Sequence, residues 1–214
     1  MALVRHDSRE VQFKIVYCGP AGGGKTTTLR YIHRRLDSRL RGDLMSISTE
    51  QDRTLHFDYL PIHATEIAGY KTRFQLYTVP GQAVLREARQ NVLAGADGVV
   101  FVADSAPDRI EANRAAREDL DGALRRHRLD PNVFPVVYQY NKRDLRGAVR
   151  PEILDELLGV RTPSFLCCAL SGYQVFASLD HLTKAVLSGF HLANRERPRP
   201  SGKASPGKVR IAVG

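Results

Sequence analysis

The sequence lacks the features of membrane-spanning, secreted and lipid-anchored proteins. No apolar run approaches the roughly 18 residues that a bilayer span requires, so we expect no transmembrane segment. Residues 1–10 are charged and contain no apolar stretch, so we expect no secretory leader. Ala2 stands where myristoylation would need glycine, and no prenylation box is present, so we expect none of the common lipid anchors.

Cysteines and metal-binding patterns are also sparse. The three cysteines, Cys18, Cys167 and Cys168, form no disulfide framework and suit a reducing cytoplasm. The seven histidines show neither the H-E-x-x-H pattern nor the Cys/His spacing of zinc sites, so we expect no structural zinc. We therefore predict a cytoplasmic protein.

The formal net charge of +9 at pH 7 lies largely in one short segment. Residues 195–214 hold six Lys or Arg against one acid, a net charge of +5, and are rich in Pro, Gly and Ser. This composition predicts a disordered tail after a single folded domain at residues 1–194. The tail could contact anionic lipid, nucleic acid or an acidic partner, but a solvated tail is the simpler reading. For the folded domain we expect no nucleic-acid binding.

Apolar runs of strand length alternate with segments of helical period. This pattern is typical of an α/β fold with a mainly parallel sheet. The uninterrupted apolar run at 98–103 is typical of a strand covered on both faces. We predict strands at 13–18, 55–61, 73–79, 98–103, 133–140 and 165–168, and helices at 25–36, 108–127, 151–158 and 175–193.

A glycine-rich segment follows the first predicted strand and opens the first predicted helix. It fits the pattern G-x-x-x-x-G-K-[ST] at every fixed position and reads Gly19-Pro20-Ala21-Gly22-Gly23-Gly24-Lys25-Thr26. Glycines let backbone N–H groups curl around a phosphate chain, and the helix start adds its positive dipole end. Lys25 is expected to reach the β- and γ-phosphates, and the Thr26 hydroxyl to bind Mg²⁺. A chance glycine-rich turn is the alternative, but the strand-to-helix position argues against it.

A second motif, Asn141-Lys142-Arg143-Asp144, has the form N-K-x-D and predicts the choice of base. The Asp144 carboxylate can accept hydrogen bonds from both the ring N–H and the exocyclic amine of guanine, a pair that adenine lacks. Sites built on such paired bonds discriminate by about 10⁴–10⁵. We expect Asn141 to tie this segment to the glycine-rich loop, and the aliphatic stem of Lys142 to cover the base. Together the two motifs predict binding of GTP or GDP with Mg²⁺.

With several further stretches, these motifs resemble the MglA family, bacterial Ras-like GTPases that set cell polarity in gliding motility. The matching stretches are GPAGGGKTT at 19–27, TEQDRTLHFDYLP at 49–61, KTRFQLYTVPGQ at 71–82, DGVVFVADS at 97–105, EAN at 111–113 and QYNKRDL at 139–145. The resemblance implies a P-loop NTPase with the Ras-like three-layer fold. It also implies a GTP/GDP switch with slow hydrolysis, located in the cytoplasm and at the cell poles.

The resemblance also assigns catalytic roles by position. Gln82 matches the glutamine that orients the attacking water, and Arg53 matches an arginine supplied in cis as an arginine finger. A solvated loop charge is the alternative for Arg53. Thr78 stands where most GTPases carry the D-x-x-G aspartate that helps to position Mg²⁺, and Thr54 offers a second Mg²⁺-binding hydroxyl. Outside the two motifs and the final guanine loop, the implied nucleotide contacts are Thr27, Thr54, Thr78 and Gly81.

Two positions depart from the common Ras-like pattern. Ala21 stands where many relatives have glycine, and its methyl group can crowd the catalytic residues, so we expect slowed rather than abolished hydrolysis. The final guanine loop is usually S-A-x, whereas here Cys168, Ala169 and Leu170 take its place. We expect the Ala169 N–H to face the guanine carbonyl. The adjacent Cys167 and Cys168 leave a redox switch open, although buried cysteines usually only pack.

The resemblance implies two classes of protein partner. One is an MglB-like roadblock protein that activates hydrolysis, and the other is a set of effectors that read the switch segments near 41–54 and 81–89. Two alternatives to an active switch stay open. A catalytically weak guanine-nucleotide-binding scaffold is favoured by Ala21 and the altered final loop. An Arf-like trafficking GTPase shares the GKTT start but usually keeps D-x-x-G and an N-terminal lipid site.

Overall fold

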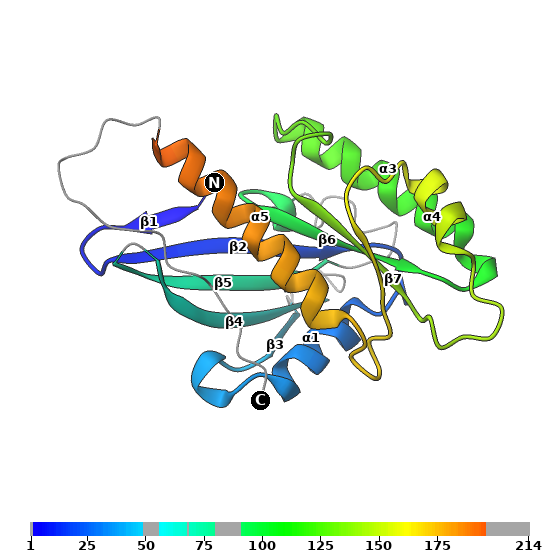
Figure 1. Ribbon diagram of the computed structural model, residues 1–214, viewed down its shortest axis with the longest axis horizontal. Helices are drawn as coiled ribbons and strands as arrows, with labels where there is room; N and C mark the ends of the chain where they lie inside the picture. The colour runs from blue at the N-terminus through cyan, green and yellow to red at the C-terminus, as the bar shows by residue number, and fades with distance from the viewer. Residues whose placement is uncertain (1, 49–55, 68, 80–90, 196–214) are drawn as a thin grey trace.

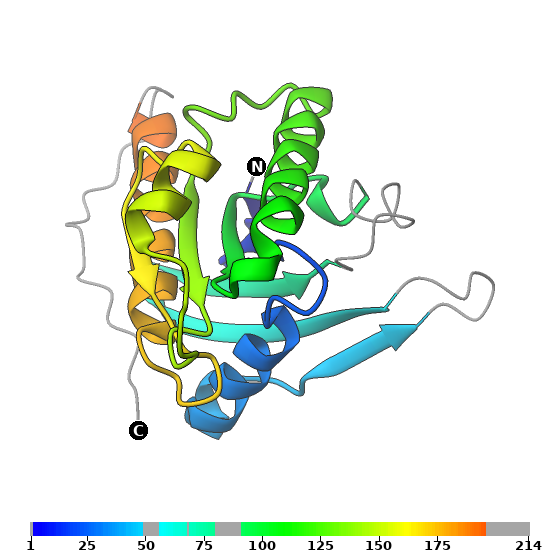
Figure 2. The ribbon, with the colours of Figure 1, turned by 90° about the vertical axis from the view of Figure 1, so that its right-hand side faces the viewer.

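The computed structural model describes residues 2–48, 56–67, 69–79 and 91–195. The described residues form one eight-stranded sheet with helices packed on both faces (Figure 1, Figure 2). Across the sheet the strands are β3 (Met45–Ser48), β4 (His56–Ile67), β5 (Tyr70–Thr78), β2 (Glu10–Cys18), β6 (Gly98–Asp104), β7 (Val136–Asn141) and β8 (Ser164–Leu166), and β1 (Leu3–Arg5) pairs with β2. The predicted α/β architecture with three layers is confirmed.

Each face of the sheet has its own apolar core. On one face, α1 (Lys25–Arg35) and α5 (Val175–Arg195) pack against residues such as Phe13, Ile15 and Leu76. On the other, α3 (Ile110–Arg126) and α4 (Pro151–Leu158) cover Val16, Phe101 and other side chains of the same strands. Because successive side chains of a strand point to opposite faces of the sheet, β2 and β6 contribute residues to both cores. Both strands are buried along most of their length. None of the described helices is long and apolar enough to span a membrane.

The strand directions bring several loops to one edge of the sheet. Strands β5, β2, β6, β7 and β8 run parallel, while β4 runs antiparallel to β5. The carboxyl ends of parallel strands share an edge, which is where α/β proteins bind their ligands. The amino end of the antiparallel β4 lies at this edge too.

The structure differs from the predicted elements at the sheet margins. Strands β1 and β3 were not predicted, and β4 continues six residues past Pro61 to form a long hairpin with β5 around Gly69. The predicted helix at 108–127 begins with a 3₁₀ turn, η3 (Pro107–Arg109). The last strand ends at Leu166 rather than Cys168, and α5 extends to Arg195. Residues 196–214 lie outside the described residues, so the division into a domain and a tail stays a prediction.

Candidate functional site

The glycine-rich loop joins the end of β2 to the start of α1 and requires glycine at two points. Gly19 and Gly24 have φ values of 132° and 102°, in the region that side chains avoid. A Cβ on Gly19 would lie 2.2 Å from the carbonyl oxygen of Val102 in β6. A Cβ on Gly24 would lie 2.1 Å from Nδ2 of Asn141. The glycines therefore let the loop pack directly on β6 and against the N-K-x-D segment.

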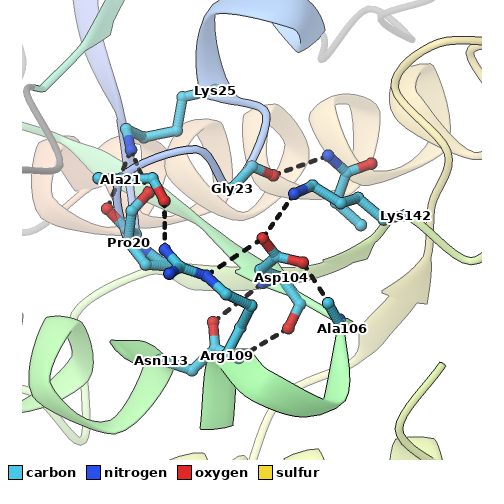
Figure 3. Close-up of polar contacts among 11 residues, drawn as sticks. Pro20, Ala21, Gly23, Lys25, Asp104, Ala106, Arg109, Asn113 and Lys142 are labelled. Atoms are coloured by element: carbon cyan, nitrogen blue, oxygen red, sulfur yellow. Dashed lines mark hydrogen bonds and ion pairs between the residues drawn. The ribbon is translucent and has the colours of Figure 1, made fainter. Parts of the chain in front are cut away.

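Lys25 lies buried in the first turn of α1, with its ammonium group turned into the loop (Figure 3). Its Nζ donates to the carbonyl oxygens of Gly19 at 3.0 Å and Pro20 at 2.7 Å. Thr26 and Thr27 follow it in the same turn of the helix. A lysine at the start of a helix, under a loop of backbone N–H groups, makes a positively charged cradle suited to phosphate.

Asn141, at the end of β7, connects three loops. Its Nδ2 donates to the carbonyl oxygen of Gly23 at 2.8 Å, as predicted for the tie to the glycine-rich loop. Its Oδ1 accepts from the backbone N–H of Ala169 at 2.8 Å. Asn141 is 2% exposed, so both bonds are shielded from water. The Ala169 N–H, which we expected to face guanine, is thus directed at Asn141 in this structure.

Of the residues that follow Asn141, Lys142 has a bonded side chain and Asp144 has an exposed one. Lys142 adopts a left-handed φ of 66° and donates from Nζ to Oδ2 of Asp104 at 2.6 Å. Asp144 is exposed. Sequence reasoning missed Asp104, although an acid ending an otherwise apolar strand was a visible signal.

The final loop follows β8 and is fixed by backbone bonds. Cys167 receives the Arg143 N–H on its carbonyl oxygen at 3.1 Å, which joins this loop to the N-K-x-D segment. Cys168 is buried, whereas Leu170 is 75% exposed. Gly172 packs on the ring of Tyr31 in α1, where a Cβ would lie 1.7 Å from Cζ.

An acid that the sequence reasoning missed lies beside the phosphate loop. Asp58 of β4 is 7% exposed and faces Thr78 of β5, whose hydroxyl accepts the Asp58 N–H at 2.8 Å. Oδ2 of Asp58 accepts from the Thr26 hydroxyl at 2.6 Å and from Thr78 at 3.1 Å, and Oδ1 accepts from Ser46 at 2.7 Å. A carboxylate among hydroxyl groups is the oxygen-donor chemistry that Mg²⁺ prefers. The residues present therefore fit the ion implied by the phosphate loop.

The position of Asp58 in β4 could have indicated that this residue has a functional role. Asp58, Leu60 and Ile62 alternate along the strand and all three are buried. An acid in register with the apolar face of a strand needs a partner, and that marks it as a candidate functional residue.

The structure thus brings together most of the predicted site at one edge of the sheet. The residues that meet there are Gly19, Ala21, Gly22, Gly23, Gly24, Lys25, Thr26, Thr27, Thr78, Asn141, Lys142, Asp144, Cys168, Ala169 and Leu170. Four predicted residues, Arg53, Thr54, Gly81 and Gln82, lie outside the described residues.

The buried Cys167 should react slowly with alkylating agents. Burial, together with the neighbouring Cys168, raises the pKa of the Cys167 thiol to about 12, and its side chain is 1% exposed. The reactive thiolate is then scarce at pH 8, so we expect iodoacetamide to label Cys167 about 10³-fold more slowly in the folded protein than in urea. Timed quenching and peptide mass spectrometry measure both rates. Equal labelling rates in the folded and the unfolded protein would show that the Cys167 thiolate is accessible, and would support the redox hypothesis.

Comparison with known proteins finds relatives over nearly the whole chain. The ADP-ribosylation factor (Arf) family model matches residues 2–186. The mutual gliding-motility protein MglA of Myxococcus xanthus (strain DK1622) is 47% identical over 189 residues, which cover 88% of this chain and 97% of that protein. ADP-ribosylation factor-like protein 2 of Drosophila melanogaster is 29% identical over 180 residues, 81% of this chain and 87% of that protein.

These matches agree with the site geometry and with the resemblance seen in the sequence. The chain matches both the ADP-ribosylation factor family model and MglA, so the Arf-like and the MglA-like readings do not exclude each other. The identity to MglA confirms the more specific of the two. The chain therefore belongs to the ADP-ribosylation factor family and is an MglA-like small GTPase.

Proposed function

We propose that this protein is a GTP/GDP switch with slow intrinsic hydrolysis, acting in bacterial cell polarity or motility. The observation that carries the proposal is the double hydrogen bond of Asn141 to Gly23 and Ala169. One buried side chain holds the phosphate-binding loop and the base-binding loops in a single site. The gliding-motility name of the MglA relative supports the cellular role.

The nucleotide lies along the edge of the sheet between these loops. The backbone from Gly19 to Gly24 and the ammonium of Lys25 receive the phosphates. Asp144 reads guanine from the open side, and the stem of Lys142 covers the base. The contacts we assign are Gly19, Ala21, Gly22, Gly23, Gly24, Lys25, Thr26, Thr27, Thr54, Thr78, Gly81, Asn141, Lys142, Asp144, Cys168, Ala169 and Leu170.

Thr26 and Thr54 are the hydroxyl ligands that we assign to Mg²⁺. The Thr26 hydroxyl donates its hydrogen bond to Asp58, so the lone pairs of the hydroxyl oxygen can face a cation. Asp58, aligned by Thr78 and Ser46, stands in for the D-x-x-G aspartate. When bound, the ion neutralises charge on the phosphate oxygens.

Hydrolysis depends on two further side chains. Gln82 orients the water that attacks the γ-phosphorus, and Arg53 neutralises the charge that develops as GDP leaves. The methyl group of Ala21 narrows the space for both and slows the reaction. Intrinsic rates for such enzymes are on the order of 10⁻⁴ to 10⁻² s⁻¹.

Slow hydrolysis requires a partner to end the signal. An MglB-like roadblock protein is the activating partner that we propose, and effectors read the switch segments near 41–54 and 81–89 in the GTP state. The protein acts in the cytoplasm and at the cell poles, and its basic tail at 195–214 is available to an acidic partner or surface.

Single-turnover hydrolysis of bound GTP tests the proposal. We expect guanine nucleotide to co-purify, GTP to be hydrolysed slowly, and an MglB-like protein to accelerate phosphate release. ATP serves as the control substrate and should not bind. Gln82→Leu should keep GTP affinity while lowering turnover by at least about tenfold.

The opposite results distinguish the rival function. Tight GTP binding with no phosphate release, alone or with the partner, would identify a guanine-nucleotide-binding scaffold. Equal affinity for ATP would overturn the assignment of Asp144.

A further inference from the structure

Arg109 reaches from the start of α3 to the tip of the phosphate loop, and no motif predicted this contact. Its Nη2 donates to the carbonyl oxygen of Ala21 at 2.6 Å (Figure 3). Its Nε lies 3.6 Å from Oδ2 of Asp104, which is 1% exposed. Ala21 and Arg109 are 88 positions apart in the sequence. The guanidinium of Arg109, which is not part of the loop, is therefore bound to the backbone of the loop.

Resting on the proposed function, we propose that Arg109 is a positioning residue for phosphate binding, which orients the Gly22 N–H toward the phosphates. In a planar trans peptide the C=O and the following N–H point in opposite directions. By holding the Ala21 carbonyl oxygen, Arg109 turns the Gly22 N–H to the other side of the chain. Gly22 has a φ of 73°, which the peptide needs for this orientation and which glycine adopts without strain.

Side chains also hold three other carbonyl groups of the loop. Lys25 binds those of Gly19 and Pro20, and Asn141 binds that of Gly23. Asn141 thereby orients the next N–H, which belongs to Gly24. Lys25 is also the side chain that binds phosphate oxygens in such loops. Arg109 is free of that second task and can hold the tip of the loop throughout.

Asp104, the ion-pair partner of Arg109, is itself held in place by several hydrogen bonds. Its backbone N–H donates to Oδ1 of Asn113 at 2.9 Å, and its carbonyl oxygen accepts from Nδ2 of Asn113 at 2.8 Å. Its carboxylate also accepts the Ala106 N–H at 3.1 Å. A buried carboxylate held this firmly needs cations, and Arg109 and Lys142 supply them.

The same carboxylate links the two halves of the site. Lys142 belongs to the guanine-reading segment, and Arg109 touches the phosphate loop through Ala21. The link suits arginine because its separate nitrogens contact Asp104 and the Ala21 carbonyl oxygen at once. Lysine has a single nitrogen on a flexible stem and lacks the planar fork that presents two separate donor nitrogens.

Dissociation of GDP and binding of guanosine together test this role. In Arg109→Gln we expect GDP and GTP to dissociate about tenfold to a hundredfold faster, the effect of one lost charge-assisted hydrogen bond. The affinity for guanosine, which carries no phosphate, should be unchanged. Arg109→Lys should rescue only partly. Arg114→Gln is the matched control, since Arg114 lies exposed on the adjoining helix α3, where it pairs with Glu111 at 3.5 Å.

Three results would overturn the inference while leaving the proposed function intact. These are wild-type GDP release in Arg109→Gln, an equal loss of GDP and guanosine affinity, and full rescue by Arg109→Lys. The second would mean a general structural role, and the third would mean that charge alone suffices. If the wild-type protein itself fails to hold GDP, the proposed function falls, and this inference falls with it.

Discussion

Asp58→Asn is expected to weaken Mg²⁺-dependent binding of GDP and GTP by about 10²–10³, which corresponds to roughly 3–4 kcal/mol. The carboxylate of Asp58, which is 7% exposed, accepts hydrogen bonds from Thr26, Thr78 and Ser46. An amide of the same shape removes the negative charge and turns an N–H₂ group toward one of these hydroxyls. Bonds to a charged acceptor contribute about 1.5–3 kcal/mol each, so this loss is large.

Release of a fluorescent GDP, with and without EDTA, measures the effect. Chelation should accelerate release strongly from the wild-type protein but barely from Asp58→Asn, which already releases GDP fast. Asp180→Asn is the control, because Asp180 pairs with Lys184 on an exposed face of α5. Unaltered sensitivity to EDTA in Asp58→Asn would remove this residue from the Mg²⁺ site.

A double variant separates loss of charge from loss of packing. Asp58→Asn combined with Thr78→Asp moves the carboxylate across the β4–β5 pair, to the position where most GTPases carry it. We expect this exchange to restore part of the dependence on Mg²⁺. No restoration, with the variant still folded by circular dichroism, would mean that the carboxylate must come from β4.

Gly19→Ala is expected to abolish nucleotide binding and to destabilise the fold by about 2–5 kcal/mol. The new Cβ would lie 2.2 Å from the Val102 carbonyl oxygen, which belongs to the backbone of a central strand and cannot move aside. The φ of 132° adds strain for any residue with a side chain. Urea unfolding and GDP titration measure the two effects.

Gly69→Ala is the matched control for backbone strain. Gly69 also has a positive φ, 79°, but no described atom lies within 4 Å of its Cβ position. It should therefore lose only about 1–2 kcal/mol of stability and keep normal GDP affinity. If Gly19→Ala costs no more than Gly69→Ala, the close approach to β6 has no energetic weight.

The buried strands were predictable because their sequence pattern is local. The apolar run of β6 and residues 13–18 of β2 are recognisable without knowledge of their neighbours. Strand β1 is three residues long and forms because β6 pairs only with residues 15–18 of β2, which leaves the edge at 10–12 open. Strand β4 continues past Pro61 because β3 pairs only with residues 56–59, so the missing N–H breaks no bond to β3.

The glycine-rich loop and the N-K-x-D segment were recognisable from the sequence itself. Both rely on backbone shape and on a few side chains within eight consecutive residues, so glycine spacing and one asparagine suffice to predict them. The tie from Asn141 to Gly23 was predictable for the same reason, because it joins two motifs.

Only the tertiary structure decided which acid accepts the hydrogen bond of Thr26 and which cation binds the carbonyl oxygen of Ala21. Asp58 meets Thr26 across 32 positions, and Arg109 meets Ala21 across 88. The first contact depends on the antiparallel register of β4 on β5. The second depends on the position of the 3₁₀ turn that ends at Arg109, directly before α3. A shift of one residue in a strand reverses the facing of its side chains, and no local pattern fixes that register.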